Sequence, residues 1–109
     1  MTTTITKIAE LNDQCRKSIP NESLRLTISI YSKETEEITE IIELIKKFDV
    51  FTEDNDPYKE HDFGIIEYKS QRIFWKIDYF DLNLEYGSPD ATDPAKTKRV
   101  LTIMLAQEY

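Results

Sequence analysis

Isoleucines recur along residues 38–48 at the spacing of one face of an α-helix. The apolar side chains fall at positions i, i+3, i+4, i+7 and i+10, which places them within one stripe of a helical surface. Ser32 is the predicted N-cap of this helix, because Glu34 and Glu36 then lie in a first turn that favours negative charge. The apolar positions of the predicted helix are Ile38, Ile41, Ile42, Ile45 and Phe48.

Alternation of apolar and polar residues predicts the strands of a sheet. The segment Leu24–Ile30 has a strict period of two, which is typical of a half-buried strand. Phe63–Tyr68 and Arg72–Tyr79 are two further β-rich runs, and the three residues between them predict an antiparallel hairpin. One face of the second run is expected in the core, and it consists of Ile73, Trp75, Ile77 and Tyr79.

Two more helices are predicted near the ends of the chain. The first covers about Thr4–Lys17 and stops before Pro20. The second runs through Val100–Leu105, with Asp93 and Pro94 read as its N-cap and first helical position, although a terminal strand is the alternative. The apolar stripe of the first helix is expected to contain Ile5, Ile8, Asn12, Cys15 and Ile19.

The order of the predicted elements indicates the fold class. Helices and strands follow one another as α-β-α-β-β-α, with loops over Asp49–Asp62 and Phe80–Thr92. This order favours an α+β domain, in which helices pack on a three-stranded sheet of antiparallel type. The length of 109 residues suits a single domain over residues 1–109.

The acidic balance of the chain excludes several classes of function. Its 21 acidic and 14 basic residues give a formal charge of −7, whereas direct binding of nucleic acid needs a basic surface. No apolar run approaches the length that spans a bilayer, about 18 residues, and the first ten residues lack the apolar stretch of a secretory signal. The single cysteine, Cys15, fits a reducing compartment, so a cytoplasmic location is expected.

The acidity is concentrated between Glu34 and Asp62. That stretch holds eleven acidic residues and three lysines, whereas the rest of the chain holds ten acids and eleven bases. Glu36, Glu40 and Glu43 fall on one stripe of the predicted helix, opposite the isoleucines. A solvated helix face is one interpretation. The other is imitation of a phosphate backbone, since four helical residues rise about 6 Å and two nucleotide steps about 6.8 Å.

The loop from Glu53 to Asp62 is the densest cluster of groups that suit chemistry. It lacks the ligand spacing of a calcium loop, and Cys15 and His61 alone are too few soft ligands for a structural zinc site within one chain. His61 has Glu60 as a neighbour, which suits acid–base chemistry, but no nucleophile has a recognisable setting. A hydrogen-bonding structural role is the alternative for His61, and no metal or cofactor is expected.

Three stretches occur in an order that resembles a family of small bacterial proteins known only as a domain of unknown function. The first is Phe51–Tyr58 running on to Glu60–Gly64, the second is Phe74–Tyr79, and the third is Asp93–Thr97 with Arg99–Ala106. The family is frequent in proteobacteria and on plasmids and prophages. The resemblance implies a free-standing domain in a mobile-element setting, and it implies no catalytic residues.

Together these observations predict a protein that acts by binding another protein. Mobile elements carry small acidic proteins that block restriction and CRISPR complexes, whose basic channels attract negative charge. We therefore expect a non-enzymatic inhibitor of such a defence complex, which acts by nucleic-acid mimicry or other protein binding. The alternatives are an accessory interaction module with another target and a small metal-dependent enzyme using the loop Asp54–Asp62. The expected contact residues are Glu36, Glu40, Glu43, Asp54, Asp56, Glu60 and Asp62.

Overall fold

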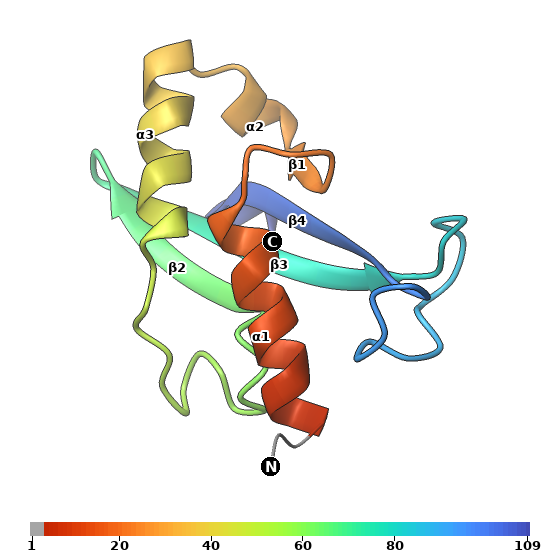
Figure 1. The fold of residues 1–109 in the computed structure, drawn as a ribbon. Helices are drawn as coiled ribbons and strands as arrows, with labels where there is room; N and C mark the ends of the chain where they lie inside the picture. The colour runs from red at the N-terminus through yellow and green to blue at the C-terminus, as the bar shows by residue number, and fades with distance from the viewer. Residues whose placement is uncertain (1–3) are drawn as a thin grey trace.

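The computed structural model describes the backbone of residues 4–109 and the side chains from residue 7 onward. Within that range, three α-helices lie with a four-stranded sheet in one small α+β unit (Figure 1). The strands have the order β1-β4-β3-β2 across the sheet. In chain order the elements are α1 (Thr4–Lys17), β1 (Leu24–Leu26), α2 (Ile28–Tyr31), α3 (Thr35–Lys46), β2 (Phe63–Tyr68), β3 (Gln71–Phe80), β4 (Lys98–Leu105) and the 3-10 helix η1 (Ala106–Glu108).

The predicted hairpin is confirmed. Strands β2 and β3 are antiparallel, with Phe63 opposite Lys76 and Tyr68 opposite Gln71. The two turn residues, Lys69 and Ser70, have φ values of 49° and 66°. A two-residue hairpin turn of this kind needs positive φ at both central positions, so here two non-glycine residues adopt the conformation that glycine usually supplies.

The prediction of a helix over Val100–Leu105 is wrong, and the alternative of a strand holds. Strand β4 lies inside the sheet, antiparallel to β3 and parallel to β1. Leu101 and Ile103 are fully buried on one face, and Met104, on the other face, is only 4% exposed. A strand buried on both faces has no alternating pattern, and β4 raises the number of strands from three to four. Asp93 begins only a turn, in which its Oδ1 accepts the N–H of Ala95 at 2.9 Å.

The predicted strand Leu24–Ile30 is correct only as far as Leu26. The chain then forms the single helical turn α2, which leaves Ile28 81% exposed and Ile30 buried. The hydroxyl of Ser32 donates a 2.7 Å hydrogen bond to the carbonyl of Ile28. Ser32 therefore ends α2, and the prediction that it caps the following helix is wrong, because Glu34 occupies the N-cap of α3 without a side-chain capping bond.

The core lies between the sheet and the two longer helices, α1 and α3 (Figure 1). Ile41, Ile42 and Ile45 of α3 are buried, which confirms the predicted apolar face of that helix. Trp75 of β3 is also fully buried, as predicted. Gly64 on β2 lies against its indole, and a Cβ atom there would come within 2.4 Å of the indole Nε1.

The inward face of α1 is rotated relative to the prediction. Asn12 and Ile19 are fully buried as expected, whereas Cys15 is only half-buried and Arg16 is 1% exposed. The side chain of Ile5 lies outside the described side chains. Helix α1 therefore turns two polar groups toward the interior, the amide of Asn12 and the guanidinium of Arg16.

Candidate partner-binding site

The outer side of α3 carries three of the acidic residues that the sequence singled out. Glu36, Glu40 and Glu43 are exposed, while buried isoleucines occupy the opposite side of the helix. The Nζ atom of Lys46 lies 3.7 Å from the Glu43 carboxylate, and the hydroxyl of Tyr68 donates a hydrogen bond to Glu40. The three residues form what we call the α3 stripe, and it presents its carboxylates to solvent.

The acidic residues of the loop 49–62 divide between solvent and interior. Asp54 is exposed, whereas Asp56 is 5% exposed. The Oδ1 atom of Asp56 accepts the backbone N–H groups of Glu60 at 3.0 Å and His61 at 3.2 Å. Lys59 and His61 both have φ of 57°, a left-handed conformation that these hydrogen bonds help to hold. The Asp56 carboxylate therefore fixes the path of the loop.

Glu60 and Asp62 are half-buried beside the same part of the loop. The hydroxyl of Tyr79 donates to the Glu60 carboxylate at 3.3 Å. Burial raises the pKa of Tyr79 well above its usual value, which keeps this donor protonated. Burial also raises the pKa of Asp62, and the nearby carboxylates of Glu60, Asp56 and Asp78 add to the effect. The expected contact residues that lie exposed are thus Glu36, Glu40, Glu43 and Asp54.

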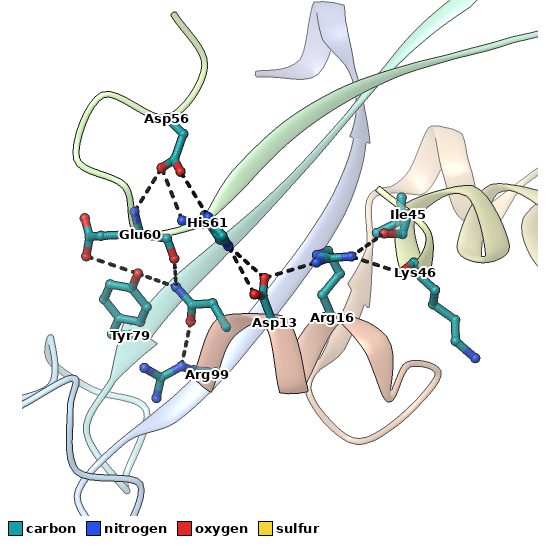
Figure 2. Close-up of polar contacts among 10 residues, drawn as sticks. Asp13, Arg16, Ile45, Lys46, Asp56, Glu60, His61, Tyr79 and Arg99 are labelled. Carbon is teal, nitrogen blue, oxygen red and sulfur yellow. Dashed lines mark hydrogen bonds and ion pairs between the residues drawn. The ribbon is translucent and has the colours of Figure 1, made fainter. Parts of the chain in front are cut away.

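His61 lies between two carboxylates, as Figure 2 shows. Its Nδ1 atom is 3.0 Å from Oδ1 of Asp13, and its Nε2 atom is 3.7 Å from Oδ2 of Asp56. The imidazole stacks on the ring of Phe51 with centroids 3.9 Å apart and planes 5° apart. Because both ring nitrogens already face carboxylates and one ring face is covered, the geometry favours the structural role of His61.

Asn12 joins four segments of the chain at a buried point beside this loop. Its Nδ2 atom donates to the backbone carbonyl of Glu60 at 2.9 Å and to the hydroxyl of Tyr79 at 2.7 Å. Its Oδ1 atom accepts a 2.7 Å hydrogen bond from Nε of Arg99. Arg99 in turn donates from Nη2 to the carbonyl of Ala91 at 2.6 Å. Helix α1, the loop, β3 and β4 therefore meet at one amide group.

Arg16 holds the C-terminal end of α3 from the neighbouring helix (Figure 2). Its Nη1 atom donates to the carbonyls of Ile45 at 3.1 Å and Lys46 at 3.0 Å, and its Nη2 atom pairs with Asp13 at 3.1 Å. The last carbonyls of a helix lack partners within the helix and carry partial negative charge. The guanidinium of Arg16 supplies hydrogen-bond donors to these carbonyls and a positive charge beside them. It also lies 5.6 Å from the ring centroid of Phe51.

These contacts fix the helix that carries the α3 stripe against α1 and the loop 49–62. The C-terminal turn of α3 is held by Arg16, Arg16 is held by Asp13, and Asp13 contacts His61 of the loop. Sequence reasoning missed Arg16 and Asp13. A signal was present, because Arg16 follows Asn12 by four residues and so falls on the same side of the helix as the apolar stripe.

The described residues contain few arrangements suited to metal or thiol chemistry. In the range 4–109, no group of three or more His, Cys, Asp or Glu side chains is placed to hold a metal ion. Burial raises the pKa of the Cys15 thiol, which disfavours the reactive thiolate. None of the helices in the described part of the chain is both long and apolar enough to cross a membrane.

Comparison with known proteins places the chain in a family without assigning it an activity. No curated protein and no solved structure matches it. A family model does match, over residues 26–108, and its description is "Protein of unknown function (DUF3768)". The match covers every strand after β1 together with α2, α3 and the loop between α3 and β2. The chain therefore belongs to this family of uncharacterised proteins, as its three sequence stretches predicted.

Proposed function

We propose that this protein is a non-enzymatic binding domain whose α3 stripe occupies a basic surface of another protein. The target class is a nucleic-acid-binding defence complex of the CRISPR or restriction type. The single observation that carries the proposal is the exposure of Glu36, Glu40 and Glu43 on one side of a helix whose other side is buried. Negative charge in this arrangement suits a groove that normally holds phosphates.

The spacing and the rigidity of the α3 stripe support mimicry of nucleic acid. Glu36 and Glu40 are one helical turn apart, a rise of about 6 Å, which is close to the rise of two nucleotide steps along a duplex strand. The stripe lies on a helix that Arg16 and the core hold in place, so little ordering is needed when it binds. Asp54 adds an exposed carboxylate on the loop that follows the helix.

A binding assay against purified defence complexes tests the proposal. We expect the protein to bind a target complex with an affinity that falls as salt rises, because surface charges are screened beyond about 8 Å at 0.15 M. The triple variant Glu36→Lys, Glu40→Lys, Glu43→Lys is expected to lose binding. Nucleic acid bound to the target beforehand is expected to compete. Circular dichroism of the variant shows whether α3 is still folded.

The matched control reverses three exposed glutamates outside the stripe. Glu10→Lys, Glu22→Lys and Glu85→Lys change the net charge by the same amount and leave α3 untouched. If both triple variants lost the same amount of affinity for the target, net charge alone would explain the binding, and the proposal would be contradicted. If nucleic acid on the target did not reduce binding of the protein, the result would instead favour an accessory interaction module with another kind of target.

A further inference from the structure

The face of the sheet turned away from α1 and α3 contains a cavity of about 620 Å³. Lys76 and Asp78 line it from β3, and they alternate with the buried residues Trp75 and Ile77 that face the helices. Phe63 lines it from β2, opposite Lys76 in the register. The volume is within the range of small-ligand pockets, roughly 300–1,000 Å³. This cavity belongs to a different face from the α3 stripe.

Aromatic rings form part of the cavity wall. The ring of Phe63 packs edge-on against Tyr109 with centroids 5.8 Å apart, and against Phe74 with centroids 5.3 Å apart. Tyr58 and Tyr109 also line the cavity and are 73% and 75% exposed. Exposed tyrosines at the mouth of a pocket offer flat, apolar surface to a ligand at little cost in conformational entropy.

The charges of the lining are unbalanced. Asp62, Asp78 and Glu108 contribute carboxylates, and Lys76 contributes one ammonium group, which lies 2.9 Å from Asp78. Asp62 lies beside this part of β3, since the N–H of Ile77 donates to the backbone carbonyl of Asp62 at 2.8 Å, and both Asp62 and Asp78 line the cavity. The carboxylate of Glu108 already has a partner within the protein, since it accepts the backbone N–H of Leu105 at 2.8 Å.

We propose that this cavity binds the guanidinium group of an arginine side chain, with Asp62 and Asp78 as its acceptors and the rings of Tyr58 and Phe63 beside its flat faces. A guanidinium is planar, donates in a fork that suits carboxylates, and stacks on aromatic rings. The compact, strongly hydrated ammonium of lysine matches aromatic walls less well. The inference stands apart from the proposed function, because it concerns the other face of the sheet.

Titration with N-acetyl-arginine amide, followed by NMR of the backbone amides of residues 58–63 and 76–78, tests this site. We expect saturable binding confined to those residues. N-acetyl-citrulline amide has a similar shape without the charge. Its binding is expected to be at least about tenfold weaker, because its ureido group keeps N–H donors but loses the positive charge that strengthens hydrogen bonds to carboxylates. Binding of the arginine probe is also expected to lower the pKa of Asp62, because a nearby cation favours the carboxylate.

Substitutions locate the site. Asp62→Asn and Asp78→Asn are each expected to weaken binding of the arginine probe by about tenfold. Asp54→Asn, on the same loop but outside the lining, is expected to leave it unchanged, as is the triple reversal of the α3 stripe. Equal binding of the citrulline probe, or no effect of either cavity substitution, would overturn the proposal.

Discussion

The side-chain oxygen of Asn12 accepts a 2.7 Å hydrogen bond from Nε of Arg99, and this bond links α1 to β4 through the protein interior. The two residues are 87 positions apart. Burial lowers the pKa of Arg99, but a guanidinium stays protonated in proteins, so this group is a charged donor that needs an acceptor at this point. Asn12 supplies that acceptor, and its amide nitrogen serves Glu60 and Tyr79 at the same time.

Removal of this amide is expected to destabilise the fold strongly. Asn12→Ala leaves Nε of Arg99 and the carbonyl of Glu60 without their partner in a buried place, which we expect to lower the free energy of unfolding by about 2–3 kcal/mol. Urea denaturation followed by circular dichroism measures the change. Gln14→Ala, on an exposed position of the same helix, is expected to shift it by no more than about 0.5 kcal/mol. Equal, small effects would show that the amide is dispensable.

Replacement of Arg16 is expected to loosen the end of α3. Arg16→Met keeps an apolar stem but removes both donors to the carbonyls of Ile45 and Lys46, at an expected cost of about 3 kcal/mol. Hydrogen exchange provides a local measurement, and the amide of Lys47, which bonds to Glu43 within the last turn, is expected to exchange faster. Lys17→Met, at the exposed next position, serves as the control. Unchanged exchange at Lys47 would argue against the capping role.

The two glycines are expected to differ sharply in their tolerance of a methyl group. Gly64→Ala forces a Cβ atom to within 2.4 Å of the Trp75 indole and 2.8 Å of the Phe48 ring, and overpacking of this kind costs about 1–3 kcal/mol. At Gly87 the nearest atom is 3.9 Å away, so Gly87→Ala is expected to be close to neutral. Thermal unfolding monitored by tryptophan fluorescence compares the two variants, and a similar melting temperature for both would contradict the close packing.

Asp62 is expected to make stability depend on pH. Its pKa is higher in the folded protein than in the unfolded chain, so the folded state binds more protons between the two values and stability falls as pH rises through that window. Asp62→Asn removes the penalty of the charge, and we expect it to raise the free energy of unfolding at pH 7. The gain is expected to vanish below the unfolded value, about pH 3.9. Denaturation series at several pH values provide the comparison, and a loss of stability at pH 7 would contradict it.

Local patterns in the sequence predicted the elements whose burial follows one period. The face of α3 and the β2–β3 hairpin are of this kind, because their side chains alternate between core and solvent. Strand β4 is different, since Leu101 and Met104 are buried on opposite faces and leave no alternation to read. In the candidate site, exposure of Glu36 followed from helix periodicity. The polar cluster did not, because Asn12 meets its partners 48, 67 and 87 residues away.

The position of β4 between β3 and β1 also sets the order in which the sheet can assemble during synthesis. The β2–β3 hairpin needs only contacts within residues 63–80 and can form while the rest of the chain is still being made. Strand β1 is synthesised before β2, β3 and β4. Its parallel partner is β4, so β1 has no strand to pair with in this sheet until residues 98–105 have left the ribosome. Until then one edge of β3 is also open to pairing with other chains. The edges of β1 and β3 are thus open to misassociation until β4 pairs with both.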